Sequence, residues 1–327
     1  MSGPVLVVAE HDRGDLTPAA LEAMTIARTV ALEYDAAVEA LAIGDVTAAG
    51  VDRLAEFGAE ALHVVTDELL TDYGPEIWAD CVTQVVRSLT PSIVMATGTD
   101  RGNEVIAGVA ARLDAPFAAN CIEMRRVEGG VDLTRVRWGG SLLEQAHIDA
   151  EIPLVTVAHH AIEPVPAAEP IAVTPSPIRV EIDRSLTRSM VTGRVERAAG
   201  VTLATAPVVV GGGRGVGSAE AFGPLEELAS SLGGAVGCSR AVTNNGWRNH
   251  TDQVGQTGTR IAPEVYFACG ISGAIQHWVG AAASKYIIAI NTDADANMVD
   301  KAGYAVIGDL HSVVPAITEE ILRRRGR

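Results

Sequence analysis

Short apolar runs of strand length alternate with segments of helical period from the start of this chain. In chain order, the predicted strands and helices cover residues 4–9, 18–32, 37–43, 62–65, 75–89 and 93–96. After Asp100, apolar residues recur at helical spacing and form an amphipathic stripe. Strands that alternate with helices imply a mostly parallel sheet covered on both faces. The sequence therefore predicts an α/β fold.

The same alternation restarts in the second half, and there each strand is followed by polar or glycine residues. The five predicted strands are residues 207–210, 235–237, 265–269, 286–290 and 304–307. Glycine or small polar residues follow each of them. In open parallel sheets, ligands bind outside the carboxyl ends of the strands, where the strand order reverses. Five such strand ends predict a ligand site in this half of the chain.

The length of 327 residues favours two domains, because domains commonly hold about 100–200 residues. Residues 117–158 change to strands and turns, which predicts a β-rich extension appended to the first sheet. Residues 163–177 are rich in proline and alanine and predict a surface connector. A short predicted strand follows at 178–182. We expect an N-terminal α/β domain of residues 1–195 and a C-terminal, Rossmann-like doubly wound domain of residues 196–327.

Charge and composition exclude several classes of protein. The net charge is −16, which repels phosphate backbones and argues against nucleic-acid binding. The four cysteines lie far apart without a C-x-x-C pair, so we expect buried thiols in a reducing compartment and no zinc site. No apolar run reaches the roughly 18 residues of a membrane span, and the first ten residues lack signal-peptide features. We expect a cytoplasmic protein without membrane insertion.

The glycine-rich run from Gly211 to Gly217 permits two interpretations. Val216 stands where the third glycine of G-x-G-x-x-G belongs, and no Lys-Ser/Thr follows, so neither common nucleotide template is met. One interpretation is a tight strand-to-helix turn with Arg214 on the surface. In the other, Arg214 supplies positive charge to a diphosphate or a flavin ring.

The run from Gly270 to His277 carries a stronger signal. A predicted strand ends at a glycine turn, and a helix begins with Ser272 as the expected N-cap. The N–H groups and the dipole of a helix start form an anion site. His277 would face the same crevice, but a structural role for this histidine remains an equal alternative.

Two further polar segments differ in what they predict. Residues 253–258 (Gln-Val-Gly-Gln-Thr-Gly) lack an apolar period, so we expect a loop outside the core. The loop is either exposed without a binding role or wraps a polar ligand, and we favour the second interpretation. His159 and His160 end a first-domain strand with no cysteine or aspartate nearby in the sequence. We expect both histidines to be structural.

Several of these segments together resemble the electron transfer flavoprotein α-subunit family. The segments are residues 209–217, 238–242, 253–258, 270–277, 289–291 and 308–310, in the order and at the spacing of that family. Q-V-G-Q-T-G and G-I-S-G-A-I-Q-H are specific to it. The resemblance is strong over residues 208–315 and loose in the first domain. Cys238 and the run Asn244-Asn245-Gly246-Trp247 depart from the family pattern.

The resemblance implies a cofactor, FAD, held in the second domain. The residues it assigns to FAD are Arg214, Ser239, Arg240, Gln253, Val254, Gly255, Gln256, Thr257, Ser272, Gly273, Ala274, Ile275, Gln276, His277, Asn291, Asp309 and Leu310. Thr257 would donate its hydroxyl toward flavin N5, and Arg240 and His277 would lie beside the N1/C2 side. Asn291 and Asp309 would serve the adenosine end.

The resemblance also implies partners. A β subunit that carries AMP or a second FAD would complete a heterodimer, flavoprotein dehydrogenases would donate electrons, and a quinone oxidoreductase or another acceptor would receive them. On this hypothesis the chain is an electron carrier without substrate chemistry of its own and without catalytic residues. The alternatives are an FAD-dependent oxidoreductase with its own organic substrate and a nucleotide-binding regulatory module.

Overall fold

The computed structural model describes residues 3–140, 142–193 and 201–326. The chain divides into two units, Met1–Val195 and Glu196–Arg327. The domain boundary expected between residues 195 and 196 falls within 194–200, outside the described residues. Both units are α/β with parallel sheets, so the predicted fold class is confirmed.

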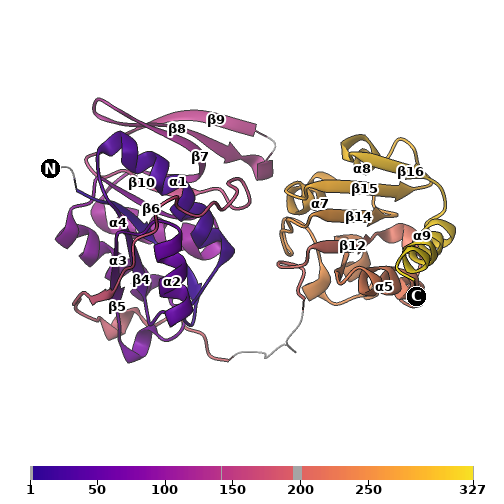
Figure 1. Ribbon diagram of the computed structural model, residues 1–327, viewed down its shortest axis with the longest axis horizontal. Coiled ribbons are helices and arrows are strands. Elements are labelled where there is room, and N and C mark those ends of the chain that lie inside the picture. Colours follow the sequence, from indigo (N-terminus) through magenta and orange to yellow (C-terminus); the bar gives the residue numbers. More distant parts are fainter. Residues whose placement is uncertain (1–2, 141, 194–200, 327) are drawn as a thin grey trace. The chain divides into compact units, whose positions relative to one another are not determined.

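The first unit is built on one nine-stranded sheet (Figure 1). Its main elements are β1 (Val5–Val8), β2 (His11–Asp12), β3 (Asp15–Leu16), α1 (Pro18–Tyr34), β4 (Val38–Ile43), α2 (Ala48–Glu56), β5 (Ala61–Val65), α3 (Pro75–Leu89), β6 (Ile93–Thr97), α4 (Asp100–Leu113), β7 (Phe117–Val127), β8 (Gly130–Arg137), β9 (Leu142–Asp149), β10 (Leu154–Val157) and β11 (Pro175–Pro177). The strand order is β11-β5-β4-β1-β6-β10-β7-β8-β9. Among the described residues of this sheet, only β7–β8 and β8–β9 pair antiparallel.

Helices cover both faces of the parallel part of this sheet. The apolar face of α1 packs on one side, and α3 and α4 pack together on the other. Local signals fix where α1 begins, because Thr17 accepts a hydrogen bond from the Ala20 N–H and Pro18 occupies the first turn. The central strands are buried on both faces, which explains their continuous apolar sequence.

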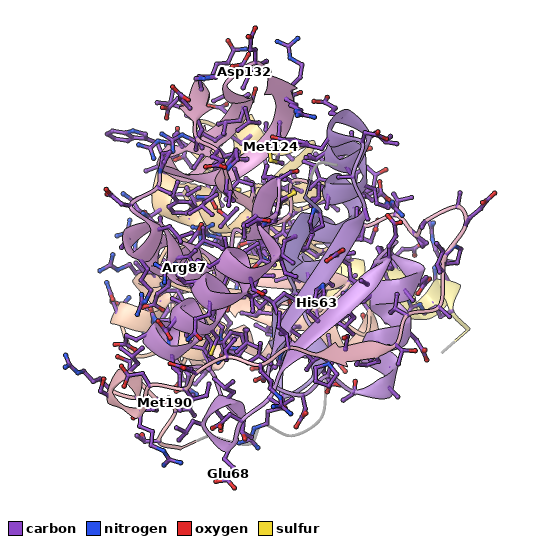
Figure 2. The ribbon with its side chains drawn as sticks, turned by 90° about the vertical axis from the view of Figure 1, so that its left-hand side faces the viewer. His63, Glu68, Arg87, Met124, Asp132 and Met190 are labelled. Atoms are coloured by element: carbon purple, nitrogen blue, oxygen red, sulfur yellow. The ribbon has the colours of Figure 1, made fainter. Side chains whose placement is uncertain are left out.

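Two details of the first unit differ from the sequence predictions. β10 is not part of an appended extension, because it lies between β6 and β7 inside the sheet and pairs parallel with both. No strand forms at 178–182; the strand is β11, which pairs with β5 at the sheet edge. Edge strands tolerate proline because one side of the strand needs no N–H donors. Figure 2 shows Met124 and Asp132 of the antiparallel extension at the opposite end of this unit from Glu68 and Met190.

The second unit is a smaller, fully parallel sheet. Its main elements are β12 (Val208–Gly212), α5 (Gly223–Ser231), β13 (Ala235–Cys238), α6 (Arg240–Asn244), β14 (Val265–Cys269), α7 (Ile275–Ala281), β15 (Tyr286–Asn291), α8 (Asn297–Lys301), β16 (Tyr304–Ile307) and α9 (Leu310–Arg324). The strand order β13-β12-β14-β15-β16 is doubly wound, as predicted. α5 and α9 pack on one face, and residues of α7 and α8 pack on the other.

None of the helices in the described residues is both long and apolar enough to cross a membrane. The four cysteines are free and buried, as expected from the sequence. Burial raises the pKa of each thiol to about 12.

Thiol labelling tests this burial. Because a thiol reacts through its thiolate, we expect Ellman's reagent to leave all four cysteines of the folded protein unlabelled at about pH 8. All four should react once the chain is unfolded in guanidinium. Ser312→Cys places a thiol at an exposed position and serves as the positive control. Rapid labelling of the folded native protein would contradict the burial.

Candidate functional site

The candidate site lies at the carboxyl edge of the second sheet, where the strand order reverses between β12 and β14. The loops after these two strands touch directly. The Gly213 N–H donates to the Cys269 carbonyl at 2.8 Å. A Cβ at Gly213 would lie 2.1 Å from the Gly270 carbonyl oxygen, so no side chain fits there. The glycines therefore allow the ends of β12 and β14 to touch. Where the strand order reverses, the surface consists of backbone atoms without side chains.

The turn into α7 differs from the sequence prediction. Ser272 is not the N-cap; Ala274 is, and it makes no side-chain capping bond. Ser272 is exposed, and its carbonyl accepts from the Met298 N–H at 3.2 Å. Gly273 adopts φ +77°, and a Cβ there would lie 2.3 Å from the Met298 nitrogen. Because of the glycine turn, the N-cap lies two residues after the predicted Ser272. Since this N-cap is an alanine, no side chain accepts a hydrogen bond from the first N–H groups of the helix.

His277 lies in the first turn of α7 and is 6% exposed. Its Nε2 and the Tyr266 hydroxyl are hydrogen-bonded at 2.8 Å. Burial lowers the pKa of His277 to about 4, against a smaller opposing contribution from the Val254 backbone, so the imidazole is neutral at pH 7. Its Nδ1 is buried and has no hydrogen-bond partner in the described part of the chain. A buried polar atom without a partner is costly, and a ligand group would satisfy it.

Tyr266 holds this histidine in place and was missed by the sequence analysis. It is fully buried in β14, and a Cβ at Gly211 would lie 2.4 Å from its hydroxyl oxygen. Gly211 thus provides the space that the phenol occupies. In the sequence Tyr266 is one of several apolar residues in a strand, and no local signal separates it from core.

The loop at 253–258 is only partly the exposed segment that the sequence predicted. Gln253 and Val254 are buried, whereas Gln256 and Thr257 are exposed. The Gln253 amide donates to Thr257 Oγ1 at 2.9 Å, and its carbonyl accepts from the Thr243 hydroxyl at 2.8 Å. These two bonds satisfy the buried side chain. Thr257 Oγ1 accepts this bond, so its own O–H remains available to donate to another group.

The backbone of this loop is pinned against α7. The Gln256 N–H donates to the Gln276 carbonyl at 2.7 Å. Gly255 and Gly280 pack so closely that a Cβ at Gly280 would lie 2.3 Å from the Gly255 nitrogen. The sequence analysis did not single out Gly280. The structure therefore joins the two family-specific segments, 253–258 and 270–277, into one wall.

Two arginines and a serine follow the neighbouring strands β12 and β13. Arg214 and Arg240 are exposed at the carboxyl ends of these strands. Ser239 is the N-cap of α6, and its side chain makes no capping bond. Because β12 and β13 are parallel neighbours, both arginines follow strands that end at the same edge as the glycine turns. Positive charge and hydrogen-bond donors thus gather at this edge.

The remaining predicted residues, Asn291, Asp309 and Leu310, make contacts within the second unit. The Asn291 amide donates to the Ile271 carbonyl at 3.1 Å and ties β15 to the glycine turn. Asp309 caps α9 by accepting from the His311 N–H. Leu310 is 5% exposed and belongs to the core. All three residues lie at the carboxyl edge of the sheet, but the Leu310 side chain packs against Gly270.

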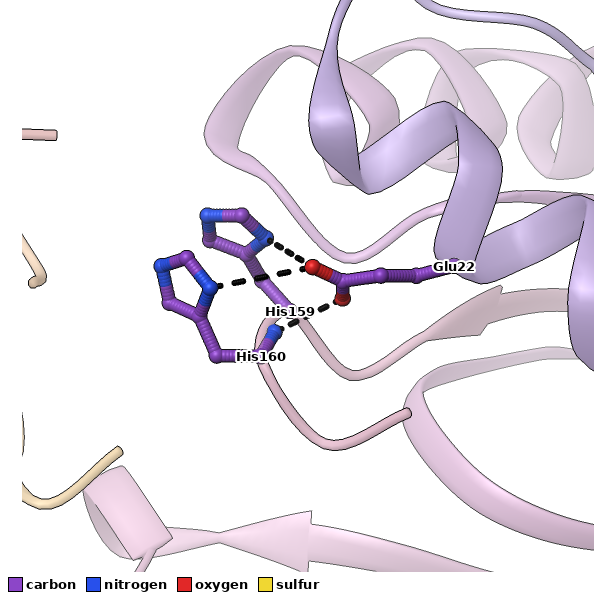
Figure 3. A group of neighbouring side chains, drawn as sticks. All are labelled: Glu22, His159 and His160. Carbon is purple, nitrogen blue, oxygen red and sulfur yellow. Dashed lines mark hydrogen bonds and ion pairs between the residues drawn. The ribbon is translucent and has the colours of Figure 1, made fainter. Parts of the chain in front are cut away.

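The first unit holds one unexpected cluster. His159 and His160 were expected to be structural for lack of an acidic partner near them in the sequence. In the structure Glu22 of α1, 138 positions from His160, faces both rings (Figure 3).

A doubly wound sheet with a glycine-lined, donor-rich edge is the architecture of a protein that binds a nucleotide-type cofactor. The family model described as "Electron transfer flavoprotein domain" matches residues 5–182, and the "Electron transfer flavoprotein FAD-binding domain" matches residues 202–282. The chain belongs to the electron transfer flavoprotein α-subunit family. It carries electrons, and its cofactor is FAD.

Individual relatives agree over nearly the whole chain. An "Electron transfer flavoprotein subunit alpha" of Mycobacterium tuberculosis is 38% identical over 98% of this chain and 99% of its own length. The corresponding subunit of Bacillus subtilis is 34% identical, covering 98% of both chains. "Protein FixB" of Azorhizobium caulinodans is 35% identical over 98% of this chain and 89% of its own. The predicted family, cofactor and electron-transfer role are thereby confirmed.

The neutral state of His277 can be tested by titration. We expect its ring resonances, assigned in labelled protein by their loss in His277→Gln, to stay unchanged as the pH falls to about 5 and to move near pH 4. The pKa of His277 in the folded protein lies below the ordinary 6.5. As the pH falls, the unfolded chain therefore takes up this proton at a higher pH than the folded chain does. The contribution of His277 to stability is therefore complete above about pH 6.5 and is lost as the pH falls toward 4. A midpoint close to 6.5 would show that the ring is hydrated.

Proposed function

We propose that the carboxyl edge of the second unit holds the FAD through the residues that the family motifs indicate. The observation that carries this proposal is the buried, unpartnered Nδ1 of His277 beside a glycine-lined strand reversal. A ligand with hydrogen-bond acceptors and a diphosphate fits both features. The FAD-binding family model covers the same segment up to residue 282.

The side chains divide into groups with different roles. The O–H of Thr257 donates to the flavin ring, while its oxygen accepts from Gln253. Arg240 and the Nδ1–H of His277 stabilise the negative charge that the ring gains on reduction. The turn at residues 272–275 receives the diphosphate. Asn291 and Asp309 serve the adenosine end, while Leu310 contributes through its backbone and through packing.

We further propose that the chain has no substrate chemistry of its own. Bound FAD supplies the redox chemistry, and the residues of this chain bind it and set its potential. His277 is neutral and engaged with Tyr266, which supports a role toward the cofactor over one in proton transfer to an organic substrate. Flavoprotein dehydrogenases donate the electrons, and a quinone oxidoreductase or another acceptor receives them.

The partner in this proposal is a β subunit that carries AMP or a second FAD. The antiparallel extension of the first unit supplies an apolar surface for it. Trp138, Leu142 and Leu143 lie at one end of β8 and β9 and are 80%, 56% and 66% exposed. Exposed apolar clusters mark interaction sites. We also propose a cytoplasmic location, because four free thiols suit a reducing compartment.

Arg240 provides the test of the FAD site. A hydrogen bond to a charged group contributes about 1.5–3 kcal/mol, and about 1.4 kcal/mol corresponds to roughly 59 mV for one electron. Arg240→Ala should therefore lower the first reduction potential by about 60–130 mV in a spectroelectrochemical titration. Arg240→Lys should restore part of the loss, since the charge remains without the planar fork.

The matched control is Arg324→Ala, which removes an exposed arginine from the last turn of α9. It should leave the potential unchanged. An unchanged potential in Arg240→Ala with FAD fully bound would place Arg240 outside the flavin site.

Leu143 provides the test of the interface. Leu143→Glu should weaken the heterodimer at least about tenfold, because an unpaired carboxylate in an interface costs more than roughly 1.4 kcal/mol. Analytical ultracentrifugation measures the change. Leu32→Glu alters a residue of α1 that is 84% exposed and should have no effect. Equal affinities for the two variants would refute this surface as the interface.

A further inference from the structure

A compact group of three potential metal ligands lies in the first unit. Glu22 comes from α1, and His159 and His160 come from the turn after β10. Their ligand atoms all lie within 4.8 Å of one another. Figure 3 shows the Glu22 carboxylate facing both imidazole rings, with the rings side by side. This group lies in the first unit and is separate from the candidate FAD site of the second unit.

The backbone explains how two consecutive histidines reach the same carboxylate. In an extended strand, consecutive side chains point to opposite faces. His160 instead adopts φ +62°, a left-handed conformation that few non-glycine residues adopt. The turn brings the two rings to a centroid distance of 3.5 Å. Both rings are thereby placed beside one oxygen of Glu22.

Glu22 is oriented toward the rings by a separate contact. Its side chain is 5% exposed, and its Oε2 accepts from the His160 N–H at 2.7 Å. This bond leaves Oε1 to face the imidazoles. A carboxylate held by a backbone donor on one oxygen and presenting the other is a common arrangement in metal sites.

The distances suit an ion between the groups better than direct hydrogen bonds. Oε1 lies 3.5 Å from Nδ1 of His159 and 3.7 Å from Nδ1 of His160. Both distances exceed the 2.7–3.2 Å of an N–H···O bond. Nδ1 of His159 is buried without a hydrogen-bond partner among the described residues. Two ligands at the Zn–N and Zn–O bond lengths of a tetrahedral site lie about 3.3 Å apart, close to the observed spacing.

We propose that Glu22, His159 and His160 form a binding site for a divalent first-row transition metal, of which Zn²⁺ is the representative. Two imidazole nitrogens and one carboxylate oxygen are the ligands that such ions prefer over Mg²⁺ or Ca²⁺. The three residues fill three positions of a tetrahedron and leave the fourth for water or another ligand. The ion joins α1 to the end of β10, two elements of the same unit.

Calorimetric titration of the full-length protein with ZnCl₂ tests the proposal, after treatment with EDTA and in the presence of excess Mg²⁺. We expect one Zn²⁺ per chain at this site. Glu22→Gln and His159→Ala should each weaken binding by more than the roughly 10–100-fold that the loss of an outer-shell partner costs. His160→Asn, which tolerates the left-handed conformation, should do the same.

The control is His63→Gln, since His63 and Glu39 form a direct two-residue pair at 2.7 Å elsewhere in this unit. This variant should bind Zn²⁺ as the native protein does. FAD content and circular dichroism establish that each variant is folded. Native protein that binds no Zn²⁺, or binding that survives both Glu22→Gln and His159→Ala in folded protein, would overturn the proposal.

Discussion

The candidate site depends on the contact between two strand ends in the second unit. A Cβ at Gly213 would collide with Gly270, and a Cβ at Gly270 would collide with Leu310 and Gly215, so neither glycine can be replaced by a residue with a side chain. A hydrogen bond from Gly213 to Cys269 fixes the contact. Because β12 and β14 are neighbours at the reversal of strand order, their following segments turn to opposite faces of the sheet. The crevice and its exposed backbone donors follow from this arrangement.

Buried polar residues hold the exposed ones in position. Tyr266 fixes one nitrogen of His277, and Gln253 fixes the hydroxyl of Thr257. In both cases a fully or nearly buried side chain hydrogen-bonds one atom of its neighbour. Such a supporting layer keeps donors oriented before a cofactor arrives, so little reorganisation is needed when the charge on the cofactor changes.

Much of the fold could be predicted from local sequence. The helices at 75–89 and after Asp100 and the strands at 265–269 and 304–307 form as predicted, because apolar period and capping residues are local properties. The prediction of a strand at 178–182 was wrong. The strand forms earlier, at β11, because there the backbone pairs with the neighbouring strand β5. The prediction of Ser272 as N-cap was wrong, because Gly273 adopts a left-handed backbone conformation and the N-cap is Ala274.

The sequence by itself determined the fold class, the family and the cofactor, because strand and helix periods and the two long motifs are contiguous in the chain. Only the tertiary structure decided which residues support the motifs. Tyr266 meets His277 through a helix packed on a strand, and Glu22 meets His159 and His160 across the first unit. Such contacts join residues that are far apart in the sequence, so they depend on how helices and strands pack and cannot be predicted from local sequence.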